Sequence, residues 1–274
     1  MANMKEIKKR IKSISDTKKI TNAMYLTSSA KLSSGRIRLA QLEPRLEAVE
    51  KQIKAIAPFI KDSKYTSVNE QGKTLWLLIG SDRGLAGDFS KEIVKKYEKL
   101  SEKENEVYVL GSAVKKICNV KKINFTSEFD FSLKNPDYSL AKEISGILAE
   151  RYNRGEISRV IILYNDLFHS ETVVKEKQYL PLVIDNAEPP EFSFYPDRAS
   201  ICEKVVSEYL INCIYGVLLK SRCAEQNSRM VAMDNANKNA GKLLDELTVQ
   251  FNHQRQNTIT REITEIAFGA GKRS

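Results

Sequence analysis

The sequence holds little of what metal-binding, catalytic or secreted proteins usually carry. Its 274 residues include four cysteines without a CxxC pair and two histidines without an HxxxH partner. These counts do not indicate a disulfide framework, a thiolate zinc site or a histidine-based metal centre. A reducing cytosol is the simplest compartment for such a chain.

Long apolar runs are also missing. The longest, "LWLLIG" and "YGVLL", fall far short of the roughly 20 residues that a helix needs to span a bilayer. The basic N-terminal segment lacks the apolar core of a signal peptide. We therefore expect neither a membrane span nor a signal peptide.

Recognisable catalytic motifs are absent as well. The best candidate is "GSDRGLAGDFS", residues 80–90, which follows a predicted strand but matches neither GxxxxGK[ST] nor GxGxxG. No serine lies in a GxSxG sequence. We interpret the glycines of residues 80–90 as turn residues between a strand and a helix. The sequence thus predicts no catalytic residue, no cofactor and no bound metal ion.

Positive charge is concentrated at the two ends of the chain. Residues 1–40 hold ten Lys and Arg against two acidic residues, residues 220–274 hold nine against six, and the middle is nearly neutral. A basic segment can bind nucleic acid, an anionic membrane surface or an acidic protein partner. Its lysines also interleave with apolar residues, as on the solvated face of a paired helix. A basic coiled-coil nucleic-acid binder or scaffold therefore remains an alternative, although no nucleic-acid motif accompanies the charge.

Apolar residues at alternating steps of four and three predict a long N-terminal helix over about residues 3–60, with a coiled-coil seam from Ile7 to Ile60. Pro44 should bend this helix without ending it. The seam weakens in the middle, where its positions fall on Lys18, Thr21, Ser28 and Gly35. These residues are either small groups that let a second helix approach closely or solvent-facing residues of a loosely paired helix.

A second long helix is predicted at the C-terminal end. No proline follows Pro196, and the spacing from Met230 to Phe251 again steps by three and four. We expect this helix over about residues 199–268, with Gly269 and Gly271 as a stop. The two helices most simply pair antiparallel in an elongated coiled coil.

The middle block changes to the pattern of an α/β domain. "TLWLLIGS" and "EVYVLGS" predict strands that are each followed by a helix, as in a parallel sheet. "TVVKEKQYLPLV" predicts an edge strand, and residues 185–197 an extended, proline-containing connector. The fold class is therefore α/β, with a long antiparallel coiled coil of N- and C-terminal helices and a small Rossmann-like α/β domain. We place the boundaries at 1–62, 72–190 and 199–268, and an enzyme built on the middle block is a further alternative.

Three separated blocks resemble one known family. The segments "IKKRIKSISDTKKITNAMYLTSSAKL" and "AEQNSRMVAMDNANKNAGKLLDELTVQFNHQRQNTITREITEIAFGA" closely resemble the gamma subunit of F-type ATP synthases, and "SDRGLAGD" is similar to SDRGLCGG of that family. The resemblance implies a rotor shaft that turns inside a ring of alternating alpha and beta subunits and couples ion flow to ATP synthesis or hydrolysis at the beta subunits. The chain itself would be a non-catalytic subunit of the enzyme complex.

The resemblance also implies partners and a location. The partners would be the alpha and beta subunits of the catalytic head, an epsilon subunit and the membrane c-ring, with no nucleic acid. The chain would lie at the cytoplasmic side of the cell membrane as a peripheral part of the synthase, associated with the membrane only through the complex. Small groups along the weak part of the seam would then form a smooth wall of the shaft, at the level where it turns inside the ring.

Matching motif positions imply six partner-contact residues, which are Met24, Arg229, Arg255, Gln256, Thr260 and Glu262. Two of them have a plain alternative, because Met24 fits an ordinary core methionine and Arg229 can pair with Glu225 one helical turn away. Arg261 and Glu265 are expected to form a local pair of the same kind. The chain departs from the family at Ala86, Asp88, Asp234, His253 and Gln254.

Overall fold

The computed structural model describes residues 4–61, 63–67, 72–101, 105–126, 131–183, 194–195 and 197–271, with the side chains of 267–271 outside the description. The chain forms two compact units. The helical unit consists of Met1–Ser28 with Met230–Ser274, and the sheet unit of Ser29–Arg229. Most of the expected connector at 185–197 lies outside the described residues.

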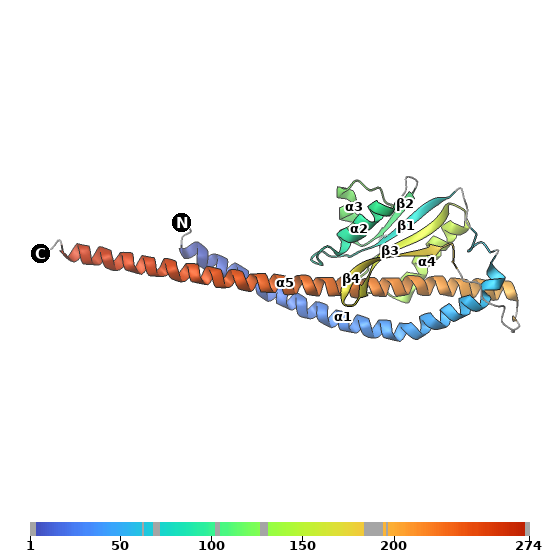
Figure 1. The fold of residues 1–274 in the computed structure, drawn as a ribbon, viewed down its shortest axis with the longest axis horizontal. Helices are drawn as coiled ribbons and strands as arrows, with labels where there is room; N and C mark the ends of the chain where they lie inside the picture. The colour runs from blue at the N-terminus through green and yellow to red at the C-terminus, as the bar shows by residue number, and fades with distance from the viewer. Residues whose placement is uncertain are drawn as a thin grey trace. The chain divides into compact units, whose positions relative to one another are not determined.

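The two predicted long helices are confirmed. Helix α1 spans Met4–Ile60 and passes through Pro44 without ending there. Helix α5 spans Arg198–Gly271, so it continues through Gly269 to the second of the two expected stop glycines. Figure 1 shows that α1 curves where it runs through the sheet unit, the part that contains both of its prolines. No helix in the described part of the chain has an apolar stretch that meets the requirements for crossing a membrane.

The sheet unit contains a four-stranded sheet in the order β2-β1-β3-β4. Strands β1 (Lys73–Ile79), β2 (Asn105–Leu110) and β3 (Ile157–Phe168) run parallel, and β4 (Glu171–Leu180) pairs antiparallel with β3 at the edge. The parallel strands and the edge strand predicted from the sequence are thus confirmed. The residues of β1 from Leu75 to Ile79 are all buried, because helices cover both faces of the sheet.

Different helices cover the two faces of the sheet (Figure 1). Helices α2 (Phe89–Leu100) and α3 (Ser112–Val120) pack on the face that carries Trp76 and Leu78. On the other face, α4 (Tyr138–Asn153) shares one apolar core with the α1 and α5 segments of this unit. The long helices are therefore part of the core of the α/β domain.

In the helical unit, α1 and α5 pair antiparallel. Thr21 on α1 donates a hydrogen bond to the side-chain oxygen of Asn237 on α5, and a Cβ added at Gly241 would lie 3.5 Å from Lys18 Nζ. The predicted seam positions Ile7, Met233 and Ala240 are buried. The spacing by three and four thus identified the faces of both helices that pack together.

Candidate partner-contact surfaces

Two small residues of the α1 seam, Ser28 and Gly35, face closely packed surroundings. In the helical unit, Ser28 is only 2% exposed. In the sheet unit, a Cβ at Gly35 would lie 2.7 Å from the Sγ atom of Cys223 on α5, which is closer than real Cβ contacts come. The interpretation that small groups let the helices approach is confirmed at Gly35. Lys18, by contrast, is exposed.

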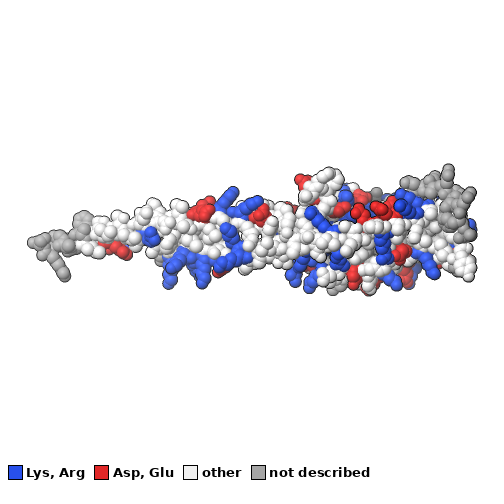
Figure 2. All heavy atoms as spheres, turned by 90° about the horizontal axis from the view of Figure 1, so that it is seen from below, with Lys and Arg blue, Asp and Glu red and all other residues white. Residues whose placement is uncertain are grey.

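Basic side chains cover the outer face of the first turns of α1. Ile7 is buried, whereas the lysines and the arginine around it are exposed, as the paired-helix interpretation predicted. Figure 2 shows Lys and Arg gathered over this part of the helical unit. The exposed basic residues are Lys5, Lys8, Lys9, Arg10 and Lys12.

The last described part of α5 exposes apolar as well as polar side chains. Ile259, Ile263 and Ile266 are 46%, 62% and 71% exposed. Large apolar side chains that remain exposed along one helix mark a surface suited to contact with another chain. Four of the predicted contact residues, Arg255, Gln256, Thr260 and Glu262, are exposed on the same part of α5.

The other two predicted contact residues lie elsewhere. Met24 is half-buried in the helical unit. Arg229 is only 7% exposed and belongs to the sheet unit. The structure thus brings four of the six residues together on one exposed helix segment, and places Met24 and Arg229 outside that segment. The predicted local pair of Arg261 and Glu265 is present, with 3.3 Å between Nε and Oε1.

The guanidinium of Arg229 is occupied by groups of its own chain. Its Nη2 atom lies 2.6 Å from Glu225 Oε1 and donates to the carbonyl oxygens of Arg83 and Gly84 at 3.3 and 3.5 Å. The Nη1 atom of Arg222 lies 2.6 Å from the other oxygen of Glu225. The alternative pairing of Arg229 with Glu225 is therefore present, and it ties α5 to the loop after β1.

The loop after β1 is a tight connection to α2, as its glycines predicted. Gly87 has a φ value of +59°, a left-handed conformation that glycine adopts without strain. Leu85, two residues earlier, has a φ value of +64°. Asp88, where the family has a glycine, has φ −89° and needs no left-handed backbone. Ala86, where the family has a cysteine, is buried beside Phe89 and Ala224. Both departures therefore fit the local structure.

Two further contacts to α5 were missed in the sequence. Asn227 Nδ2 donates to the carbonyl oxygen of Ser170 at 2.9 Å, and the hydroxyls of Ser228 and Thr172 lie 2.9 Å apart. Together with Arg229, these residues attach the β3–β4 turn and the loop after β1 to one stretch of α5. The "SRMVAM" motif indicated that this part of α5 makes important contacts. The hydrogen-bond partners could not be predicted, because they lie far away in the sequence.

The structure offers no metal centre among the residues it describes. They contain no group of three His, Cys, Asp or Glu side chains that could hold a metal ion. Of the two histidines, His169 lies at the β3–β4 turn of the sheet unit, and His253 is exposed on α5 in the helical unit. All four cysteines are free and buried.

Paired antiparallel helices that share a core with a small, mostly parallel sheet define an α/β protein, and an exposed helix segment of it is suited to contact other chains. The family model described as ATP synthase matches residues 3–271. Together with the relatives below, this match shows that the chain belongs to the ATP synthase gamma chain family. The resemblance found in the three sequence blocks is thereby confirmed.

Relatives match over almost the whole chain. The ATP synthase gamma chain of Malacoplasma penetrans is 35% identical over 288 residues, which cover 98% of this chain and 99% of that relative. That of Ruminiclostridium cellulolyticum is 32% identical, with 98% of each chain covered. In the cryo-EM structure of the Euglena gracilis mitochondrial ATP synthase OSCP/F1/c-ring, one chain matches with a TM-score of 0.71 at 15% identity, covering 99% of this chain and 96% of that one. At that identity, the likeness supports the fold.

Proposed function

We propose that the chain is the central rotor shaft of an F-type ATP synthase, turning inside the ring of alpha and beta subunits and coupling transmembrane ion flow to ATP synthesis or hydrolysis. The observation that carries the proposal is the match to gamma chains over 98% of this chain and 99% of a relative. On this proposal the chain is a non-catalytic subunit, and the chemistry belongs to the beta subunits. Family membership favours this role over a nucleic-acid binder or a metabolic enzyme.

The helical unit is the part that we propose to contact the alpha and beta subunits. Arg255, Gln256, Thr260 and Glu262 are exposed there beside apolar side chains, so they are available for contacts with the ring. The exposed basic face at the start of α1 suits acidic loops on the same ring, because opposite charges attract and orient approaching partners. We assign Met24 to the same contact region.

Arg229 has a different role in this proposal. Its guanidinium is engaged with Glu225 and with two carbonyl oxygens of the loop after β1. We therefore propose that Arg229 influences partner contacts indirectly, by holding this loop against α5.

The sheet unit completes the proposed assembly. We assign to it the contacts with the epsilon subunit and with the membrane c-ring. Membrane association would then be indirect, at the cytoplasmic side of the cell membrane, and would depend on the complex.

Purification of the native assembly tests this function. We suggest an affinity tag inserted at the turn after α3, where Val120 is 83% exposed, and solubilised native membranes treated with nuclease. We expect recovery of an ATP-hydrolysing assembly that contains several copies each of two larger subunits for each copy of this chain. Membranes with the untagged chain are the control. Recovery of the chain alone would contradict the rotor function. Recovery of the chain with nucleic acid instead of larger subunits, from membranes not treated with nuclease, would contradict it as well.

A further inference from the structure

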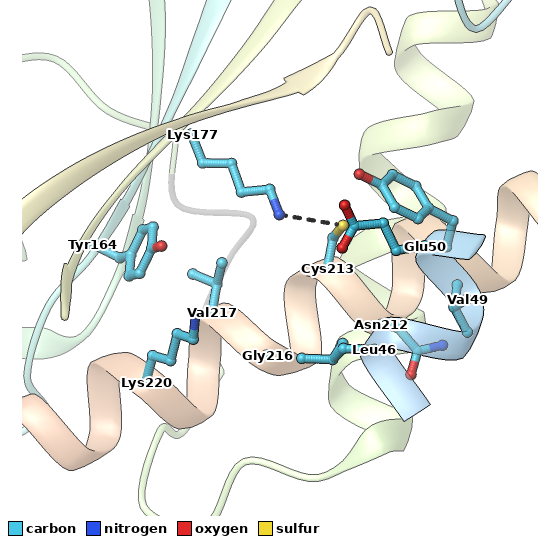
Figure 3. A pocket seen from close by; sticks show the side chains of 11 residues that line it. Leu46, Val49, Glu50, Tyr164, Lys177, Asn212, Cys213, Gly216, Val217 and Lys220 are labelled. Carbon is cyan, nitrogen blue, oxygen red and sulfur yellow. Dashed lines mark hydrogen bonds between the residues drawn. The ribbon is translucent and has the colours of Figure 1, made fainter. Parts of the chain in front are cut away.

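A cavity of about 240 Å³ lies within the sheet unit, between the two long helices and the sheet. Figure 3 shows side chains from α1, α5, β3 and β4 around it. Apolar groups such as Leu46 and Val217 form part of the lining, and Lys177 and Lys220 supply two amino groups. Its volume lies below the roughly 300 Å³ at which pockets for drug-sized ligands begin, so it suits a small group.

A thiol and an amino group meet in this cavity. Lys177 on β4 lies with its Nζ atom 3.5 Å from the Sγ atom of Cys213 on α5, and Figure 3 marks this contact. Tyr209 also lines this cavity, and burial raises the pKa of its phenol, so the phenol stays protonated near neutral pH. The thiolate is the nucleophilic form of a cysteine.

We propose that this cavity is a covalent modification site, at which Cys213 accepts a short acyl group from a thioester donor and passes it to Lys177. In the first step, the Cys213 thiolate attacks the acyl carbon. The new S–C bond replaces the bond to the donor, which leaves as a thiolate and takes the proton that the Lys177 ammonium gives up. In the second step, neutral Lys177 Nζ attacks the same carbon, a C–N bond forms, and the bond to Cys213 breaks. The Cys213 thiolate regains the proton that the amine loses.

Proximity is the physical reason for the second step. Holding two reacting groups near each other turns a bimolecular reaction into an effectively unimolecular one, and well-oriented intramolecular reactions reach effective concentrations far above those in solution. The distance of 3.5 Å between Nζ and Sγ places the amine next to the acyl group that Cys213 would carry. Acylation would remove one of the two lysine charges in the cavity. This inference concerns the chain alone and does not rest on the proposed rotor function.

Lys220 provides a comparison within the same cavity. Its Nζ atom lies 3.9 Å from the carboxylate of Asp166 on β3. Both lysines are half-buried and line one space, but the hydrogen bond to the Cys213 thiol comes from Lys177. A donor that simply diffuses into the cavity should acylate Lys177 at a rate that does not depend on Cys213, whereas transfer through Cys213 requires that thiol.

The test is to incubate the purified full chain with acetyl-coenzyme A and follow each lysine by peptide mass spectrometry. We expect Cys213→Ser to slow the acetylation of Lys177 at least about tenfold, because the transfer is intramolecular. The same substitution should leave the rate at Lys220 unchanged. Cys223→Ser is the matched control, since Cys223 is also a buried thiol of α5 but packs against Gly35, and it should leave the rate at Lys177 unchanged.

A trapping variant keeps the proposal testable if Cys213→Ser disturbs the fold. In Lys177→Arg the acyl group has no amine to move to, so a hydroxylamine-sensitive acetyl group should accumulate on Cys213. Equal acetylation of Lys177 with and without Cys213 would overturn the proposal. Failure of Cys213 to carry an acetyl group in Lys177→Arg would overturn it as well.

Discussion

At the residue scale, a few buried polar groups hold loops of the sheet unit to α5. Glu225 is 3% exposed and accepts from two arginines, so its charge is paired on both oxygens. Breaking a buried pair by removing one partner is strongly destabilising, because it leaves a charge or a carbonyl oxygen without compensation. Arg229 should therefore matter first for stability, whatever it does in an assembly.

Replacement of Arg229 by methionine tests this stabilising role. Arg229→Met keeps an unbranched apolar stem but removes the donors to Glu225 and to the carbonyl oxygens of Arg83 and Gly84. We expect the free energy of unfolding of the full chain to fall by roughly 2–3 kcal/mol in urea titrations. Arg261→Met is the matched control, because its pair with Glu265 is exposed and should contribute less than about 0.5 kcal/mol. Similar small losses for both variants would show that the Arg229 contacts do not stabilise the fold.

Sequence reasoning succeeded at this scale where partners are close in the chain. The pairs of Arg229 with Glu225 and of Arg261 with Glu265 follow from helical spacing, and both are present. The contact between Lys177 and Cys213 could not be predicted, because it joins an edge strand to a distant helix. A contact role stays a prediction for four residues that the structure places on an exposed helix segment, Arg255, Gln256, Thr260 and Glu262.

At the element scale, the close approach of α1 and α5 depends on where the small residues fall. The space at Gly35 is filled by the Sγ atom of Cys223, so a larger residue there must displace this side chain or push the helices apart. The weakened seam seen in the sequence is, at this position, a point of tight packing. Periodicity alone indicated which face of α1 is buried, but not which α5 residue lies opposite.

One substitution made in two backgrounds tests this packing, because its effect on the free energy of unfolding should have opposite signs in the two. Gly35→Ala should lower the free energy of unfolding, because overpacking costs about 1–3 kcal/mol while the better helix propensity of alanine returns only about 1 kcal/mol. In a Cys223→Ala background the Sγ atom is gone, and the same Gly35→Ala change should then stabilise the chain by up to about 1 kcal/mol. Thermal or urea unfolding of the four chains measures both effects. Destabilisation by the same amount in both backgrounds would contradict the close contact.

The helices and strands themselves were largely readable from the sequence. The long helix expected at about 3–60 is Met4–Ile60, and "TLWLLIGS" and "EVYVLGS" contain β1 and β2. These elements were predictable because spacing of three and four, or a short apolar run followed by a helical pattern, reports directly on burial. The attachment of loops to α5 was not, since it depends on tertiary contacts between segments far apart in the chain.

At the scale of the whole molecule, the proposed rotor function is inferred from family membership. Sequence composition excluded many classes of protein but left a nucleic-acid binder and an enzyme as alternatives. The match over 98% of the chain to gamma chains, together with a likeness in fold to a chain of a mitochondrial synthase, separates these classes. A rotor must turn relative to the subunits around it, and this is the property that distinguishes it from a static scaffold.

The most direct test of the rotor function is a reversible cross-link between this chain and the ring. In a Cys213→Ser background, Gln256→Cys places a thiol on the exposed part of α5, and the other three native cysteines are buried. A reagent with a maleimide, a cleavable disulfide and a photoreactive group would join this position to the surrounding subunits of the purified complex. As a control, Gly35→Cys can be oxidised to a disulfide with Cys223, which ties α1 to α5 within the chain.

We predict that ATP hydrolysis falls in proportion to the fraction of this chain linked to the ring and returns when reductant cleaves the link. The internal disulfide should leave hydrolysis unchanged, because it joins two segments of the same rotor. If a complex with this chain fully linked to the ring hydrolysed ATP at the unlinked rate, the chain would not need to turn. The proposed rotor function would then be wrong.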